Sequence, residues 1–402
     1  MWRDITRSLQ NRNYRRYLLG QLVSLHGSQI ASVTQSWLVY NMTQSSLMLG
    51  LVHFTMLFPV LLFGLLSGVL ADHFSRRRLL LVSQGSAMVL TFILAGLALS
   101  GEIVLWQIFL IAALIGTTQA VDMPVRQSFL SDLVPKEMLS NAVGLNSSVF
   151  NMARFIGPAI AGLLLLQWEE GVLFMINGFS YLLLLYLLWG MKLSPQSTTA
   201  RQAESKLSAL KAGLHYVWTH RQIRPALIHV GLISMMGTAF VVLMPVFVDQ
   251  QYEGGSDTLG WLLSAAGGGS FIGALNLARK RGGTELAPAV GWGGLVGALA
   301  LWLFSRSEEA SLSLVILFVA GFSITTVVAS TNAYIQVLVE DQMRGRVMSL
   351  FSMIFVGMAP MGSLSSGVIA EWWGIQSSVL LFSLLGGVGS LLFIYQHYYS
   401  DP

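Results

Sequence analysis

Twelve apolar runs, each about as long as a bilayer is thick, constrain the fold of this chain more than any other feature. A helix needs roughly 20 apolar residues to cross a hydrocarbon core of about 30 Å. Leu61–Leu66 and Leu182–Leu188 show none of the polar and apolar alternation that is typical of membrane barrel strands. The fold class predicted is therefore an all-α membrane protein with twelve transmembrane helices. The runs fall at about 18–40, 47–70, 79–100, 103–123, 139–166, 171–191, 226–249, 258–278, 286–305, 311–332, 346–370 and 375–396.

The composition agrees with lipid as the main solvent. Hydrophobic residues make up 54% of the 402 residues and charged residues only 10%, against roughly 25% charged in ordinary globular domains. Cysteine is absent, which excludes disulfides and thiolate metal sites. The formal net charge of +4 is small and scattered. We therefore expect the lipid bilayer as a partner, and neither nucleic acid nor a cofactor.

The placement of basic residues predicts the orientation of the chain. If the N-terminus is cytoplasmic and the spans alternate, all but three of the 23 Lys and Arg residues fall on the cytoplasmic side. The exceptions are Arg126, Arg154 and Arg306. Such a bias is the positive-inside rule. It predicts a multi-pass protein of the cytoplasmic (inner) membrane with both termini in the cytoplasm.

A polar stretch at 194–224 divides the twelve spans into two sets of six. The predicted domains are an N-terminal half at 1–191, a cytoplasmic linker at 192–224 and a C-terminal half at 225–402. An offset of 205 residues aligns the halves, for example Gly162 with Gly367. Because six spans preserve orientation, this is the parallel repeat of a 6+6 transporter, with its site between the halves. The linker is either an amphipathic surface helix at 206–220 or a solvated connection.

Two motifs stand out. After the second span, Gly68 and Asp72 precede Arg76, Arg77 and Arg78. Gly64 and Gly68, four residues apart, are typical of helices that approach closely. The alternative is a simple basic cluster that sets orientation.

The second motif lies in the fifth span, where Gly157, Pro158 and Gly162 follow Arg154. Pro158 removes a backbone hydrogen bond, so this helix can bend. Small residues that serve only for packing are the alternative explanation of this motif.

Together these motifs resemble the major facilitator superfamily. The loop resembles its Gly-x-Leu-x-Asp signature, which in that family latches the halves in the outward-open state. The element in the fifth span resembles the Gly-Pro-x-x-x-Gly sequence of its exporters and antiporters. Pro124 to Asn141 and Gln336 to Ser349 are similar to the branch of enterobactin-exporter-like and macrolide-efflux-like permeases. The resemblance covers almost the whole chain and implies proton-coupled transport.

Polar residues in the spans predict the lining of a transport pathway. Positions 21, 24, 28, 32 and 35 follow helical spacing, and a polar face in lipid must meet protein or water. Packing between helices is the alternative. In the family that the chain resembles, spans 1, 4, 7 and 10 line the cavity. The candidate lining residues are Gln29, Ser32, Gln35, Gln119, Thr326, Asn332 and Gln336.

Three residues are candidates for substrate binding and proton coupling. Arg154 lies deep in the fifth span, where an arginine must face a cavity or a partner. Asp122 is its candidate partner, although Arg126, four residues from Asp122, competes for the same carboxylate. The alternative is a structural ion pair. His26 is a candidate proton carrier, against the alternative of a histidine satisfied by hydrogen bonds.

The sequence contains no Gly-Lys-Ser/Thr phosphate loop and no hydrolase motif, so we expect no enzyme activity. The predicted function is export of a small amphipathic molecule, such as a siderophore or drug, by proton antiport with alternating access. We expect a monomer. The alternatives are an importer or lysolipid flippase on the same fold, or a non-transporting membrane partner or sensor.

Overall fold

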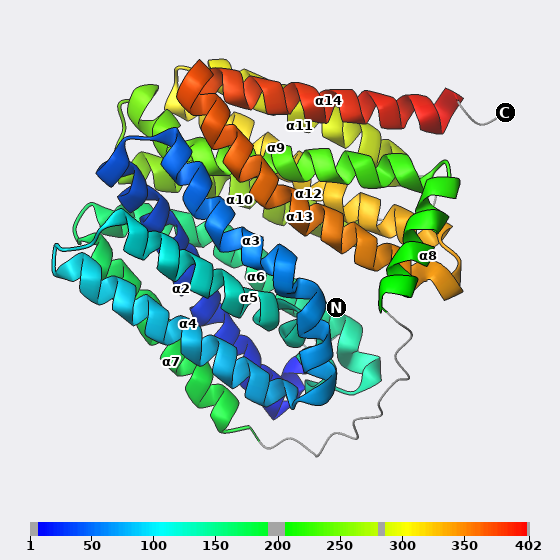
Figure 1. Ribbon diagram of the computed structural model, residues 1–402, viewed down its shortest axis with the longest axis horizontal. Helices are drawn as coiled ribbons and strands as arrows, with labels where there is room; N and C mark the ends of the chain where they lie inside the picture. The colour runs from blue at the N-terminus through cyan, green and yellow to red at the C-terminus, as the bar shows by residue number, and fades with distance from the viewer. Residues whose placement is uncertain (1–6, 192–205, 280–285, 400–402) are drawn as a thin grey trace. The chain divides into compact units, whose positions relative to one another are not determined.

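The computed structural model describes residues 7–191, 206–279 and 286–399, with side chains except at 65–73, 206–210, 277–279 and 398–399. All regular structure in these ranges is helical (Figure 1). A short 3-10 helix, η1, is followed by helices that match the twelve predicted runs and by one helix in the linker. Their bounds are η1 Arg7–Gln10, α2 Arg12–Thr43, α3 Ser46–His73, α4 Arg76–Leu99, α5 Leu105–Leu133, α6 Lys136–Leu165, α7 Glu170–Trp189, α8 Lys206–Thr219, α9 Ile223–Gln250, α10 Ser256–Arg279, α11 Leu286–Arg306, α12 Ala310–Leu338, α13 Asp341–Trp373 and α14 Ile375–Tyr399.

Among the described residues, eleven helices are long and apolar enough to cross a membrane. The twelfth long helix, α2, has 32 residues but is too polar to reach the same hydropathy. This is the span in which the sequence places a row of Gln and Ser residues. Helix α2 is therefore the most polar of the predicted spans. Its length of about 48 Å still exceeds the thickness of a bilayer core.

The chain forms two compact units. The first comprises residues 1–42, 55–200 and 255–260, and the second comprises 43–54, 201–254 and 261–402. The first turns of α3 thus belong with the second unit, and the first turn of α10 belongs with the first unit.

In the first unit, α4 packs against both α5 and α7. Asn11 caps α2, because its Oδ1 accepts hydrogen bonds from the backbone N–H groups of Asn13 (2.9 Å) and Tyr14 (3.2 Å). The hydroxyl of Tyr14 donates to the carbonyl of Ala142 at 2.8 Å. This bond ties the first turn of α2 to α6 within a buried apolar cluster that includes Phe129.

In the second unit, α9 packs against α13 and α14, and α11 packs against α12 and α14 (Figure 1). Helix α8 corresponds to the helix that the sequence offers as one alternative for 206–220 of the linker. It packs on α13, where Gly213 faces Arg346 and Leu350. Val217 is buried and Leu214 is exposed, so the two residues do not share one buried face. The rest of the predicted linker, 192–205, lies outside the described residues.

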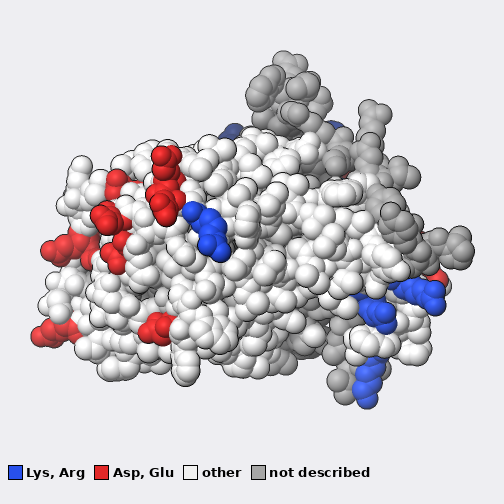
Figure 2. All heavy atoms as spheres, turned by 90° about the horizontal axis from the view of Figure 1, so that it is seen from above, with Lys and Arg blue, Asp and Glu red and all other residues white. Residues whose placement is uncertain are grey.

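Charge is segregated on the surface. On the face drawn in Figure 2, acidic side chains gather toward one end and most basic side chains toward the other, with one basic side chain beside the acidic group. Such a separation is expected of a chain whose loops follow the positive-inside rule.

Candidate functional site

A buried ion pair in the middle of the first unit is the centre of the candidate site. Asp122 and Arg126 lie one turn apart on α5, and Asp122 is 7% exposed. The Nε of Arg126 donates to Oδ2 of Asp122 at 2.9 Å, and its terminal Nη2 donates to the same oxygen. Asp122 lies 11 residues, or about 16 Å, from the end of α5 at Leu133. The pair is therefore well inside the span.

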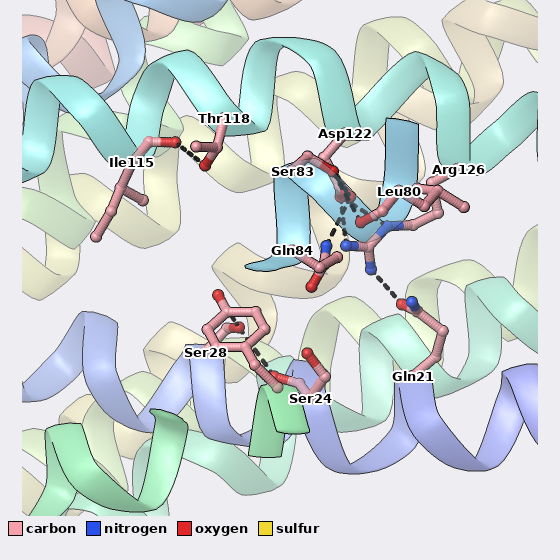
Figure 3. A network of polar contacts seen from close by, with 11 residues as sticks. Gln21, Ser24, Ser28, Leu80, Ser83, Gln84, Ile115, Thr118, Asp122 and Arg126 are labelled. Carbon is pink, nitrogen blue, oxygen red and sulfur yellow. Dashed lines mark hydrogen bonds and ion pairs between the residues drawn. The ribbon is translucent and has the colours of Figure 1, made fainter. Parts of the chain in front are cut away.

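Neutral side chains from two other helices complete the coordination of this pair. On α4, Gln84 Nε2 donates to Oδ1 of Asp122 at 2.6 Å, and Ser83 Oγ donates to it at 3.2 Å. On α2, Oε1 of Gln21 accepts a hydrogen bond from Arg126. Figure 3 shows these residues converging from three helices. A charged network held by three helices can transmit a change in protonation to their packing.

Two polar atoms beside this network have no partner among the described residues. They are Oε1 of Gln84 and the hydroxyl of Tyr17, both buried. The ring of Tyr17 stands edge-on to Phe129, with centroids 5.6 Å apart. Buried polar atoms usually have a protein or water partner. These two atoms therefore offer hydrogen-bonding positions to water or to a substrate next to the ion pair.

The hydroxyl of Tyr181 on α7 lies 3.2 Å from Oγ of Ser28 on α2. Oγ of Ser28 also donates to the carbonyl of Ser24 at 2.9 Å. The polar residues of α2 form two groups that differ in burial. Gln21 and Ser24 are buried in contacts inside the unit, whereas other members of the face are only half-buried. The half-buried members are Gln29, Ser32 and Gln35.

Arg154 does not join this network. The sequence allows Asp122 to pair with either Arg154 or Arg126, and in the structure it pairs with Arg126. Depth is measured from the end of α5 for Asp122 and from the start of α6 for Arg154. By this measure Arg154 lies seven residues farther into its helix than Asp122, or about 10 Å along the helix axis. Its side chain is exposed, and among the described residues it makes no hydrogen bond or ion pair. An arginine in this position requires water or an anionic ligand.

His26 is half-buried, and its Nδ1 lies 2.6 Å from the carbonyl of Leu22 one turn earlier. One ring nitrogen is therefore engaged by its own helix. Gln119, on α5, is half-buried, one turn before Asp122.

In the second unit, Thr326 is buried and its hydroxyl has no partner among the described residues. Gln336 donates from Nε2 to Oδ1 of Asn332 at 2.6 Å, at an exposed part of α12. These two amides are therefore hydrogen-bonded to each other. Of the three candidate residues on α12, Thr326 is the buried one.

Two of the three basic residues of the loop motif, Arg76 and Arg77, are bound inside the first unit. Arg76 forms an ion pair of 2.6 Å with Asp132 on α5. Arg77 donates from Nε to the carbonyl of Leu188 at 3.0 Å, and from Nη2 to the carbonyl of Trp189, at the end of α7. The side chains of Gly68 and Asp72 lie outside the described residues, although α3 extends through both positions.

Two pairs of glycines make very close helix crossings, each inside one unit. In the first unit, Gly162 on α6 meets Gly260 on α10, and a Cβ added to Gly162 would lie 2.9 Å from the Cα of Gly260. In the second unit, a Cβ on Gly367 of α13 would lie 3.0 Å from the Cα of Gly50 on α3. At both crossings each added Cβ would also lie within 2.7 Å of a backbone carbonyl oxygen. No side chain fits here without moving a helix.

These crossings give a physical role to part of the motif in the fifth span. Gly162 and Gly367, which the offset of 205 residues aligns, occupy the same kind of crossing. Gly157 is also packed closely, since a Cβ there would lie 2.5 Å from the Cβ of Gln29. Pro158 is buried next to it on α6. A Cβ added to Gly64, in contrast, would meet no described atom within 4 Å.

Sequence reasoning missed the two α4 residues of the site, and it placed Gln21 on the polar face of the first span without its contact with Arg126. Ser83 and Gln84 are the residues of α4 that bond Asp122, and Gln21 is the residue of α2 that bonds Arg126. The available signal was a Ser-Gln pair in an otherwise apolar run. A polar pair in lipid requires a partner, as does an arginine.

Comparisons with known proteins agree on the family. The family described as transmembrane secretion effector, a group of the major facilitator superfamily, matches residues 7–397. The staphyloferrin A transporter of Staphylococcus aureus is 29% identical over 90% of this chain and 89% of its own length. The multidrug efflux pump Tap of Mycobacterium tuberculosis is 25% identical over 91% and 89%.

Solved structures show the same fold. The nucleoside transporter NupG superimposes with a TM-score of 0.74 at 13% identity, over 96% of this chain and 100% of its own. A bacterial homologue of the human lysosomal transporter Spinster gives 0.73 at 15% identity, over 96% of both chains. The twelve-helix fold is thus confirmed, and the protein is a multi-pass membrane transporter for a small molecule, not an enzyme. The chain belongs to the transmembrane secretion effector family of the major facilitator superfamily.

Proposed function

We propose that this transporter exports a small amphipathic molecule, such as a siderophore or drug, across the cytoplasmic membrane in exchange for protons. The observation that carries the proposal is the buried Asp122–Arg126 pair, held by residues of α2 and α4. Intramembrane ionisable residues are expensive and commonly mark proton relays and substrate pathways. The efflux activity named for the relative Tap supports export as the direction.

Asp122 is the proton acceptor in this mechanism. In the unprotonated state its two oxygens accept hydrogen bonds from Arg126, Gln84 and Ser83. A proton on the carboxyl removes its negative charge and weakens its bond to the Arg126 guanidinium, which also donates to Gln21 of α2. Arg126 is then free to bind elsewhere, so the contact between α5 and α2 changes. Protonation is thereby coupled to helix packing, which is what exchange of a proton for a substrate requires.

Arg154 is the proposed contact for an anionic group of the substrate. Its guanidinium has no protein partner among the described residues. Arg154 lies one turn before Gly157 on α6, and Gly157 packs against the half-buried Gln29 of α2. An arginine binds carboxylates through two parallel hydrogen bonds. The half-buried amide and hydroxyl groups of α2, together with Gln119 and His26, would serve the rest of an amphipathic molecule.

The substitution Arg154→Gln is expected to weaken binding of an anionic substrate by roughly 10- to 150-fold, from the roughly 1.5–3 kcal/mol of a hydrogen bond to a charged group. A neutral ester of the same substrate should bind the variant and the wild type equally. Substrate binding to purified protein measures both. Arg306→Gln, which removes an arginine from the end of α11, is the control. Equal loss of the acid and the ester would contradict a direct contact.

We propose that the two six-helix halves, at 1–191 and 225–402, move against each other during transport, with 192–224 as the cytoplasmic link. A monomer is sufficient for this mechanism. Both termini would be cytoplasmic, which the segregation of charge in Figure 2 supports.

Cysteine labelling checks this orientation, because the natural chain has no cysteine. Cysteine at the exposed Glu169 should react with an impermeant thiol reagent added to intact cells, and cysteine at the exposed Ser75 should react only after the membrane is opened. The reverse pattern would invert the proposed topology.

Accumulation of a labelled siderophore or a dye in whole cells tests the function. Cells that lack the transporter should accumulate more of its substrate, and an uncoupler should raise accumulation in wild-type cells to the same level. Lower accumulation in the deletion strain would instead indicate an importer. Redistribution of a lysolipid between leaflets would indicate a flippase.

A further inference from the structure

An apolar groove lies on the surface of the first unit. It has a volume of about 420 Å³ and lies between α4 and α7, which pack together. Tyr186 and Trp189 are 73% and 76% exposed, so the groove is open to its surroundings. The lining residues are Leu81, Leu182, Leu185, Tyr186 and Trp189.

The groove lies at the basic end of both helices. Leu81 belongs to the second turn of α4, which begins with Arg76, and the other lining residues belong to the last two turns of α7. Exposed Tyr and Trp side chains at the end of a membrane span are typical of the boundary between hydrocarbon and headgroups. By the proposed orientation, this end faces the cytoplasmic leaflet.

Three arginines surround this end of the groove. Arg77 is bonded to the carbonyls of Leu188 and Trp189, and Arg16 donates to the carbonyl of Gly190 at 3.0 Å. Both guanidinium groups are therefore fixed beside Trp189, where they also complement the negative end of the α7 dipole.

The third arginine, Arg78, precedes Leu81 by three residues and so lies on the same side of α4. Its side chain is exposed and makes no hydrogen bond or ion pair among the described residues. Asp132, an acidic side chain near this end of the unit, is paired with Arg76. The mouth of the groove is thus positive.

We propose that this groove binds an anionic phospholipid of the cytoplasmic leaflet. One acyl chain lies against the leucines, Tyr186 and Trp189 cover it at the headgroup boundary, and the phosphate contacts Arg78 next to Arg77 and Arg16. An apolar channel with a cationic mouth matches the chemistry of such a lipid, and a basic residue near a membrane surface favours anionic lipids. The site is separate from the Asp122 network.

Native mass spectrometry of the purified full-length protein tests this proposal. We expect phosphatidylglycerol to be retained more tightly than phosphatidylcholine. Arg78→Gln should weaken phosphatidylglycerol binding about fivefold, the factor given by about 1 kcal/mol for one basic residue at a membrane surface. Leu81→Trp, which places a larger side chain in the groove, should weaken lipid binding. Arg344→Gln, at another exposed arginine on α13, is the matched control and should bind as the wild type does.

Equal retention of the two lipids, or unchanged phosphatidylglycerol binding in Arg78→Gln, would overturn the proposal. The side chain of Arg78 is exposed and makes no hydrogen bond or ion pair among the described residues, so Arg78→Gln should fold and can decide the test even if Leu81→Trp does not fold. Loss of transported-substrate binding in Leu81→Trp, with lipid binding intact, would assign the groove to the substrate and would also overturn it. A shift from dimer to monomer in Leu81→Trp would assign it to a second copy of the chain.

Discussion

Asp122→Asn should abolish the pH dependence of transport and slow proton-driven export by about tenfold or more, a factor that corresponds to only about 1.4 kcal/mol. Asparagine has nearly the same shape and can still accept hydrogen bonds from Ser83 and Gln84, but it cannot take up a proton. The initial rate of substrate transport in membrane vesicles, measured from pH 6 to pH 8 at equal protein abundance, checks this expectation.

The same substitution leaves the Arg126 guanidinium without its counter-charge. Breaking a buried pair costs about 3–5 kcal/mol, and removing both charges often restores stability. Asp122→Asn combined with Arg126→Gln should therefore melt at a higher temperature than Asp122→Asn alone, yet remain independent of pH in transport. Asp132→Asn is the matched control, since it breaks an ion pair on the same helix and should keep the pH dependence. A pH-dependent Asp122→Asn variant would exclude Asp122 as the proton acceptor.

Gly367→Leu should stop transport while the protein still inserts into the membrane. A Cβ at this position would lie 2.7 Å from the carbonyl oxygen of Ser46 and 3.0 Å from the Cα of Gly50, so α3 and α13 must separate. Overpacking of this kind typically costs about 1–3 kcal/mol, enough to depopulate a conformation that the transport cycle requires. Gly162→Leu should act in the same way at the crossing of α6 with α10.

Thiol labelling reports this separation directly. Ser363 is fully buried beside the crossing, and a cysteine there should be unreactive in the otherwise wild-type protein. It should become reactive when Gly367→Leu is added. Gly96→Leu is the control, because a Cβ at Gly96 meets no described atom within 4 Å. Normal transport by Gly367→Leu would show that the crossing need not close.

The fold was predictable because lipid imposes a simple rule on the sequence. Each span must be about 20 apolar residues long, so the twelve runs appear as helices in order. Most runs are shorter than the helices; for example, α2 begins at Arg12 and α13 extends from Asp341 to Trp373. Backbone hydrogen bonding continues past the apolar part of a span, where hydropathy carries no signal.

The candidate site was less predictable because it depends on which helix faces touch. A run of apolar residues does not reveal the rotation of a helix. Asp122 was predicted to contact either Arg154 or Arg126, and only the structure shows that Gln84 and Gln21 join the Arg126 pair. Gly162 was expected to let its helix bend or pack closely, and only the structure shows that its partner is Gly260. Contacts between residues far apart in sequence have no local signature of this kind.

Transport into everted membrane vesicles, whose cytoplasmic face is outward, tests proton-driven export most directly. With an acidic lumen and a labelled substrate in the medium, uptake into the lumen should be fast and should stop when an ionophore collapses the pH gradient. In Asp122→Asn it should be slower by about tenfold or more. Uptake that continues at the same rate after the gradient has collapsed would contradict exchange of the substrate for protons.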